Sequence, residues 1–112
     1  MLDRPRSGER ALLLHIGLNR PCLEDETQEF RALAESAGAQ VVAEIQARRD
    51  RPDPRFFIGS GKVEEVGARA KEVRAELILV SQPLRAGQER NLEKTLNVRV
   101  LDRNGLILDI FA

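Results

Sequence analysis

Residues 76–102 read ELILVSQPLRAGQERNLEKTLNVRVLD, and this stretch decides the fold class. ELILVS (76–81) is a short apolar run, typical of a strand that is buried on both faces. In PLRAGQERNLEKTLN (83–97), every fourth residue from Leu84 to Leu96 falls on one helical face. VRVLD (98–102) is again a strand pattern. A strand, a helix and a second strand in this order predict a parallel strand pair with a right-handed helical crossover.

The same alternation continues on both sides of this unit. ALLLHIGL (11–18) and QVVAEIQA (40–47) are strand patterns, and LEDETQEFRALAESAG (23–38) between them has one apolar helical face. A second helix follows the turn at 59–62. NGLILDIFA (104–112) is a last helix pattern, with Asn104 as its predicted N-cap. We therefore predict an α/β fold: a mostly parallel sheet of four to five strands with helices on both faces.

The run FFI (56–58) is the predicted exception to parallel pairing. Only about eight residues, RRDRPDPR (48–55), separate it from the strand at 40–47. A parallel crossover needs about a dozen residues or more. We therefore predict that 56–58 is a short strand antiparallel to its predecessor.

Composition limits the possible functions. The 112 residues favour one compact domain, and 18 Lys and Arg balance 18 Asp and Glu. This zero net charge argues against a domain that binds nucleic acid through its overall charge. Any contact with nucleic acid should therefore be local, or shared with another domain. No apolar stretch approaches the roughly 20 residues of a membrane span. The charged N-terminus lacks a secretory apolar core, so we expect a cytoplasmic protein.

The chain has one histidine and one cysteine, which argues against a disulfide and a metal cluster. His15 lies in a strand pattern among leucines, and we predict a packed, hydrogen-bonded core residue. Cys22 follows Pro21, and we predict a partly buried loop thiol. We therefore expect no metal site and no catalytic residue in this chain.

FFIGSGKVEE (56–65) is laid out almost like a phosphate-binding loop. A P-loop needs four residues between its glycines and a Ser or Thr after the lysine. Gly59 and Gly61 are separated by one residue, and Val63 follows Lys62. Triphosphate chemistry is therefore not expected here. Two interpretations remain: a tight turn with a solvated lysine, or an anion or RNA-phosphate contact at a positive helix end. The second would use Gly59, Ser60, Gly61 and Lys62.

The segment 48–55 is the most basic local stretch. Its arginines are offset only by Asp50 and Asp53. It is either a solvated loop or a phosphate-contacting loop, because guanidinium forks match phosphate geometry. Whether it shares a face with Lys62 is open. With no Tyr or Trp, and four Phe in apolar patterns, we expect no aromatic platform for single-stranded bases. The candidate contacts are Arg48, Arg49, Arg51 and Arg55.

RFFIGSGKVEEV (55–66) and QERNLEKTLNVRVLDRNGLILDIFA (88–112) resemble the N-terminal domain of the HflX-type ribosome-associated GTPases. In that family a (Y/F)-(I/V)-G-x-G-K turn follows a Pro-containing loop, and Q-x-R-N-L-E and D-R-T-x-L-I-L-D-I-F-A come later. This chain departs from the pattern at 85–87, where the family has a hydroxyl residue and proline, so the third helix should begin less firmly. Motif residues that either make contacts or serve the architecture are Gln88, Arg90, Asn91, Asp102 and Arg103.

The resemblance implies a function. HflX-type proteins bind and hydrolyse GTP, bind the large ribosomal subunit and can split ribosomes. By this resemblance, 1–103 is the α/β N-terminal subdomain and 104–112 begins the helix leading to a helical subdomain absent from this chain. GTP and Mg²⁺ would belong to a GTPase domain that is also absent, so we expect no cofactor here. The implied partners are the large ribosomal subunit, its rRNA and the protein's own GTPase domain.

The leading hypothesis is a non-catalytic module that binds the large subunit through rRNA. One alternative is a regulatory nucleotide-binding module that uses the GSGK turn. Another is a purely structural domain that orients the GTPase domain.

Overall fold

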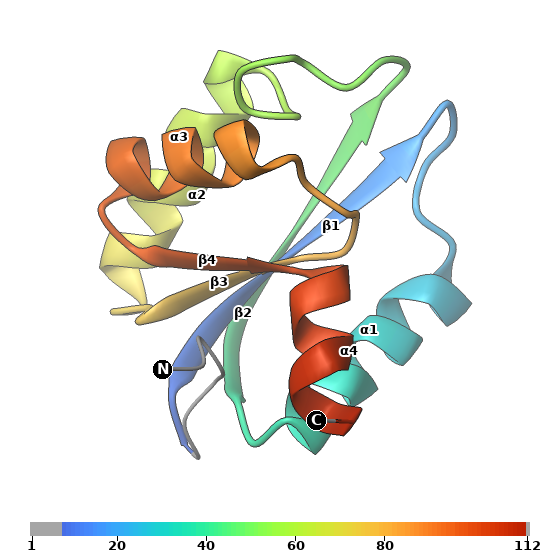
Figure 1. Ribbon diagram of the computed structural model, residues 1–112, viewed down its shortest axis with the longest axis vertical. Coiled ribbons are helices and arrows are strands. Elements are labelled where there is room, and N and C mark those ends of the chain that lie inside the picture. The colour runs from blue at the N-terminus through green and yellow to red at the C-terminus, as the bar shows by residue number, and fades with distance from the viewer. Residues whose placement is uncertain (1–7, 112) are drawn as a thin grey trace.

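The computed structural model describes residues 8–111, with the side chains of 8–108. Strands and helices alternate along the chain, as predicted (Figure 1). In order, the elements are β1 (Arg10–Leu18), α1 (Glu24–Ser36), β2 (Gln40–Arg49), α2 (Ser60–Glu72), β3 (Leu77–Val80), α3 (Ala86–Leu96), β4 (Arg99–Asp102) and α4 (Arg103–Phe111).

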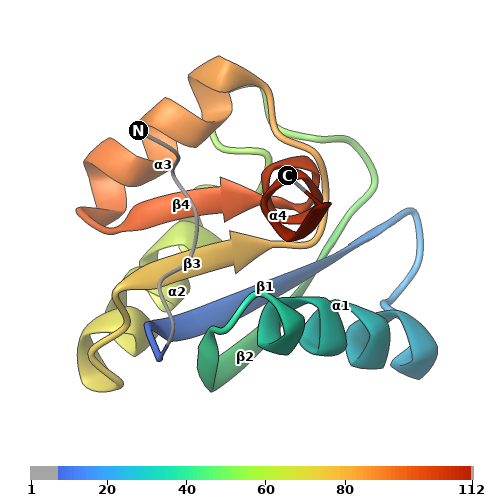
Figure 2. The ribbon, with the colours of Figure 1, turned by 60° about the horizontal axis from the view of Figure 1, so that its bottom comes forward.

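The four strands form one sheet in the order β2-β1-β3-β4, and every pair is parallel. The chain steps from β1 to β2 in one direction and from β2 to β3 and β4 in the other. Right-handed crossovers that run in opposite directions lie on opposite faces. Accordingly, α2 and α3 cover one face, while α1 and α4 cover the other (Figures 1 and 2). The prediction of helices on both faces is confirmed.

The central strand β1 is buried on both sides, which explains its continuous apolar sequence. Leu12, Leu14 and Ile16 belong to the core under α2 and α3. Ala11 and Leu13 belong to the core under α1 and α4, where Phe30 and Leu106 are both 0% exposed. Burying each leucine side chain contributes about 1.5–3 kcal/mol. This strand therefore anchors both layers.

The predicted antiparallel strand at 56–58 is wrong. Residues 53–57 form a tight turn, which Asp53 and Phe57 close by exchanging two backbone N–H···O bonds of 2.9 Å. Phe57 adopts a positive φ of 71° and is buried, and Ile58 beside it is 1% exposed. Both pack in the core under α2 and α3. The apolar run is therefore a loop segment whose side chains fill part of the hydrophobic core. All strand pairs of the sheet are parallel.

The predicted N-cap of the last helix is also wrong. The helix α4 begins at Arg103, so Asn104 lies inside its first turn. Asp102 is the capping residue, because its Oδ1 accepts the backbone N–H of Gly105 at 2.9 Å. Its Oδ2 accepts the N–H of Leu84 at 2.7 Å. Asp102 thus joins α4 to the loop that precedes α3.

The N-terminus of α3 is capped by a different type of side chain. Oε1 of Gln88 accepts the backbone N–H of Arg85 at 2.9 Å. This bond serves the helix start at which the family pattern has a capping hydroxyl residue.

None of the helices in residues 8–111 has the length and apolar character needed to cross a membrane.

Candidate functional site

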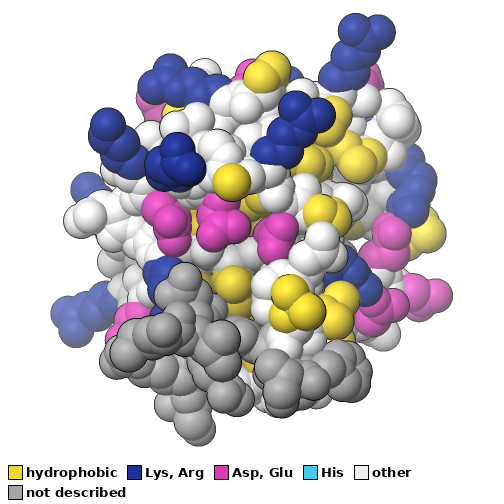
Figure 3. Space-filling view, viewed as in Figure 1, with side chains coloured by type: hydrophobic (Ala, Val, Ile, Leu, Met, Phe, Trp, Pro, Cys, Tyr) yellow, Lys and Arg dark blue, Asp and Glu magenta, His cyan; other side chains and the backbone are white. Residues whose placement is uncertain are grey.

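The basic segment forms a loop with the GSGK turn's first glycine, and residues 48–59 are called the arginine loop below. Its first two residues, Arg48 and Arg49, are the last residues of β2, so the prediction that all of 48–55 is a loop is wrong at these two positions. The remaining residues follow β2 at the edge of the sheet where all four parallel strands end (Figure 1). Arg48, Arg49, Asp50 and Arg51 line an open hollow of about 500 Å³. In Figure 3, basic side chains gather on the upper part of the molecule, where this loop and α3 lie. The loop is therefore a local basic surface on a neutral chain.

Its arginines differ in their partners. Arg48 approaches Asp50 at 4.0 Å, and Nε of Arg49 donates to the carbonyl of Arg51 at 3.3 Å. Arg51 and Arg55 are exposed. Neither takes part in the ion pairs found within the described residues. These two guanidinium groups are available to an anionic partner.

Two side chains of α3 hold the loop from behind. Nε2 of Gln88, which is 4% exposed, donates to the carbonyl of Asp53 at 2.8 Å. Nδ2 of Asn91 donates to the carbonyl of Arg55 at 3.0 Å. Both bonds end on the loop backbone, so they fix its course without using its charged groups.

The Asp53 carboxylate also accepts hydrogen bonds from the loop backbone. Its Oδ1 accepts the N–H of Arg55 at 2.8 Å and that of Phe56 at 3.1 Å. These bonds lower the pKa of Asp53, and the charges of Arg49 and Arg55 lower it further. The carboxylate therefore stays ionised as a turn-former.

The GSGK turn adjoins the arginine loop. A Cβ on Gly59 would lie 3.2 Å from Nη1 of Arg49, so this part of the loop lies at the N-terminus of α2. Nζ of Lys62 is 2.8 Å from the carboxylate of Glu65. Val63 is 4% exposed and packs in the core, so the position where a P-loop has its magnesium-binding hydroxyl faces inward. The turn does not fit a triphosphate.

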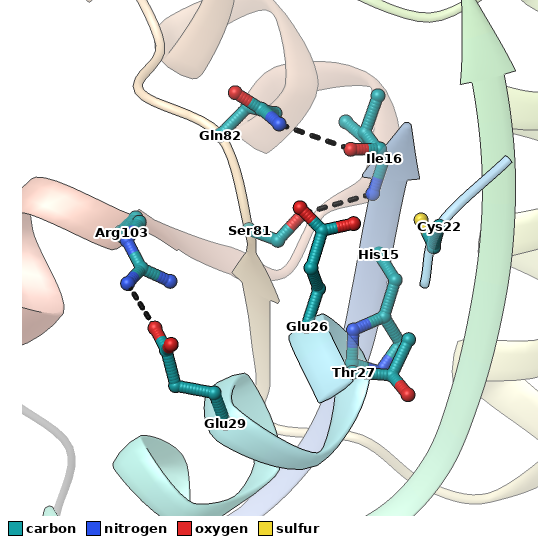
Figure 4. Close-up of a pocket in the computed structure, with 9 residues that line it drawn as sticks. All are labelled: His15, Ile16, Cys22, Glu26, Thr27, Glu29, Ser81, Gln82 and Arg103. Atoms are coloured by element: carbon teal, nitrogen blue, oxygen red, sulfur yellow. Dashed lines mark hydrogen bonds and ion pairs between the residues drawn. The ribbon is translucent and has the colours of Figure 1, made fainter. Parts of the chain in front are cut away.

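A second hollow, which we call the switch-point pocket, lies at the C-terminal ends of β1 and β3 (Figure 4). It has a volume of about 320 Å³. Open α/β sheets bind ligands at this kind of place, where the strand order reverses. The amino-acid sequence does not reveal this pocket, because it does not display the order of the strands in the sheet. Its lining comprises His15, Ile16, Cys22, Glu26, Thr27, Glu29, Ser81, Gln82 and Arg103.

The polar groups of the switch-point pocket bind one another. Oγ of Ser81 accepts the N–H of Ile16 at 2.8 Å, and Nε2 of Gln82 donates to its carbonyl at 3.0 Å. Arg103, a predicted motif residue, pairs with Glu29 and so links α4 to α1. The pocket is thus largely a structural junction.

The α1 end of the pocket carries negative charge. The Glu26 carboxylate accepts two bonds of 2.8 Å from Arg20 and one of 3.0 Å from the N–H of Leu23. These bonds lower the pKa of Glu26 to about 2. Because this carboxylate already occupies the N-terminal end of α1, a phosphate is disfavoured there.

The predictions for the two single residues are confirmed. His15 is 2% exposed, and its Nε2 lies 2.8 Å from the carboxylate of Glu44, which Arg31 also holds at 2.7 Å. Cys22 is half-buried; burial and the charge of Glu26 raise the pKa of its thiol. Within the described residues, no three His, Cys, Asp or Glu side chains are grouped so that they could hold a metal ion.

Residues 24–112 match the family model described as GTP-binding GTPase N-terminal. The chain belongs to this family. The GTPase HflX of Escherichia coli (strain K12) is 42% identical over 112 residues, which are 100% of this chain and 26% of that protein. GTPase HflX of Caldanaerobacter subterraneus subsp. tengcongensis is 37% identical over the same coverage. The chain spans about a quarter of the length of these relatives and corresponds to the N-terminal part of HflX.

Solved structures show the same fold. A GTP-binding protein from Sulfolobus solfataricus in complex with GDP superposes with a TM-score of 0.68 at 21% identity, over 92% of this chain and 30% of that chain. A complex of SsGBP and GDP gives a TM-score of 0.70 at 20% identity, over 91% and 28%. The predicted resemblance to HflX-type proteins is confirmed by the family match.

In this HflX-type domain, most of the Q-x-R-N-L-E motif serves the architecture. Gln88 and Asn91 hold the arginine loop, and Leu92 lies in the core. Oε2 of Glu93 accepts the N–H of Val100 at 3.0 Å and ties α3 to β4. Arg90 is the exposed member of the motif.

Proposed function

We propose that this chain is the ribosome-binding N-terminal domain of a cytoplasmic HflX-type GTPase, and that its arginine loop contacts the phosphate backbone of rRNA in the large subunit. The supporting observation is the pair Arg51 and Arg55, exposed and outside ion pairs on a loop whose backbone is fixed from α3. Guanidinium groups bind phosphate oxygens bidentately, and phosphate contacts position a protein on nucleic acid.

The proposal extends to the whole protein. GTP and Mg²⁺ would bind in a GTPase domain built from residues outside these 112, and that domain would be a partner of this one. The relatives are named GTPases, and Val63 occupies the position where a triphosphate site needs a hydroxyl. A role in ribosome splitting rests on the family resemblance alone.

The GTPase part of the proposal has a direct test. The purified chain should hydrolyse GTP no faster than a buffer blank, because it lacks a triphosphate site. Saturable micromolar binding of ATP or GTP by the chain would instead favour the regulatory nucleotide-binding function.

The ribosomal part is tested by co-sedimentation with purified large subunits between about 50 and about 200 mM salt, where phosphate contacts weaken steeply. The variant Arg51→Gln/Arg55→Gln should bind more weakly, and its salt slope should fall by about two, roughly one for each lost contact. The matched control Lys71→Gln/Lys94→Gln removes the same charge from the last turns of α2 and α3, at their far ends from the arginine loop. It should bind like the wild type. Equal binding and equal salt slopes for both variants would refute the contact.

A further inference from the structure

The tip of the arginine loop carries a cation–π contact between two neighbouring side chains. Cζ of Arg55 lies 4.9 Å from the centroid of the Phe56 ring. Phe56 is half-buried and packs against the core under α2 and α3, whereas Arg55 is exposed. The Arg55 guanidinium therefore lies over the ring, and the Arg55 side chain remains accessible to solvent.

The pair sits on a backbone with little freedom. The two reciprocal backbone hydrogen bonds between Asp53 and Phe57 close the turn. Within the turn, the Asp53 carboxylate accepts hydrogen bonds from the backbone N–H groups of Arg55 and Phe56. The buried ring of Phe57, 6% exposed, fixes the turn to the core. A group held in this way loses little conformational entropy when a ligand binds.

The tip also receives a bond from outside the loop. Asn91 of α3 donates to the carbonyl of Arg55, the residue whose guanidinium lies over the ring. The Asn91 side chain thereby sets where the pair lies relative to α3. Its contact is with the loop backbone, so it acts through Arg55.

We propose that Arg55 and Phe56 form a stacking site for one unpaired base of RNA, with Asn91 as its positioning residue. The inference rests on the proposed rRNA contact and specifies its partner. A guanidinium plane can stack on a base while its N–H groups reach a phosphate. In a duplex both faces of a base are covered by neighbouring bases, so only a loop, a bulge or a single strand offers a free face. The preferred ligand is therefore a flexible single-stranded segment.

The test compares an unstructured single-stranded RNA of about ten nucleotides, within known single-strand site sizes, with a duplex of the same length. Affinities are measured by fluorescence anisotropy. The variant Arg55→Lys keeps the positive charge but loses the planar face, and Phe56→Leu keeps an apolar side chain but loses the ring. Each should weaken single-strand binding by about 5- to 150-fold, the range for losing one stacked base. Duplex binding should change by less than about twofold, because charge is retained.

Asn91 is tested with Asn91→Leu, which has a similar shape but no N–H donor, and with Asn91→Ala. Single-strand affinity should fall while the salt slope stays at the wild-type value, because no charge is lost. An RNA with 2-aminopurine as the stacked base adds a spectroscopic readout. Its fluorescence should change when the wild type binds, because its stacking partner changes, and should change less with either Asn91 variant. A fluorescence response equal to wild type would refute the positioning role.

The two proposals fail differently. If Arg55→Lys and Phe56→Leu bind both RNAs like the wild type while Arg51→Gln/Arg55→Gln still loses large-subunit binding, the stacking site is wrong and the phosphate contact stands. If the wild type binds neither RNA nor large subunits, both are wrong.

Discussion

The switch-point pocket and the arginine loop lie at the same edge of the sheet, but their charged groups differ in their partners. In the pocket, the charged side chains form ion pairs: Glu26 with Arg20, and Arg103 with Glu29. At the arginine loop, side chains of α3 bind the loop backbone, and Arg55 takes part in none of the ion pairs found within the described residues. The pocket occupies the usual ligand position of an α/β sheet, yet the available charge is in the loop. The partners of the side chains, rather than the place of a hollow in the fold, distinguish the two candidates.

The largest predicted effect is a loss of folding stability beside the switch-point pocket, caused by a steric clash with backbone atoms. A Cβ on the buried Gly17 would lie 2.1 Å from the carbonyl oxygen of Arg20 and 2.9 Å from the N atom of Cys22. Because these are backbone atoms, Gly17→Ala must displace the chain, and we expect a loss of about 2–4 kcal/mol in the free energy of unfolding. Urea denaturation measures it.

Gly87→Ala is the matched control, since no atom lies within 4 Å of its added Cβ. This position is in the first turn of α3, so alanine should gain up to about 1 kcal/mol. Equal stability of the two variants would mean that the chain tolerates a side chain at Gly17.

The second prediction tests the loop side. Gln88→Ala removes the donor to Asp53 and the acceptor of the Arg85 amide at a buried position. Leaving these backbone groups unsatisfied should destabilise the fold by about 1–3 kcal/mol. Arg90→Ala, at the exposed neighbour on the same helix, should stay within about 0.5 kcal/mol of the wild type. If the two variants unfold at the same urea concentration, Gln88 does not hold the loop.

The smallest predicted effect concerns pH. The pKa of Glu26 is lowered in the folded state to about 2, so its ion pair stabilises the fold at pH values above the ordinary carboxyl pKa. That contribution is lost as the pH falls through the folded-state value. Glu26→Gln should therefore melt at a slightly lower temperature than the wild type at neutral pH, and the two should converge near pH 2.

The corresponding change in the loop, Arg51→Gln, removes a residue outside the observed ion pairs. It should alter the melting temperature little at any pH. A difference between Glu26→Gln and wild type that is constant from pH 7 to about 2 would contradict the assigned ion pair, because such a difference could not arise from the titration of Glu26.

Periodicity predicted the elements well because it reports burial. The apolar run from Ala11 to Ile16 reads as a doubly buried strand, and β1 is one. The histidine within it pairs with Glu44, as a buried polar group must find a partner. These features depend on which residues are inside, which a sequence displays directly.

The errors occur where burial does not determine the backbone. Phe57 and Ile58 are inside, as an apolar run indicates, but they lie in a loop with a left-handed residue. That conformation depends on contacts with α3, which local sequence does not reveal. Asp102 and Asn104 are both competent caps, and Asp102 takes the cap position because α4 begins directly after β4. The roles of Gln88 and Asn91 likewise required knowing what lies beside α3.

The bonds from α3 also link distant parts of the chain energetically. Gln88 and Asn91 reach backbone carbonyls 35 and 36 residues earlier in the sequence. Phe57 is held in a strained backbone conformation that persists only while its surroundings impose it. The loop and α3 should therefore open together as one cooperative unit. Exchange of the Asp53 and Phe57 amide hydrogens with solvent would then follow the undocking of a helix rather than the fraying of a turn.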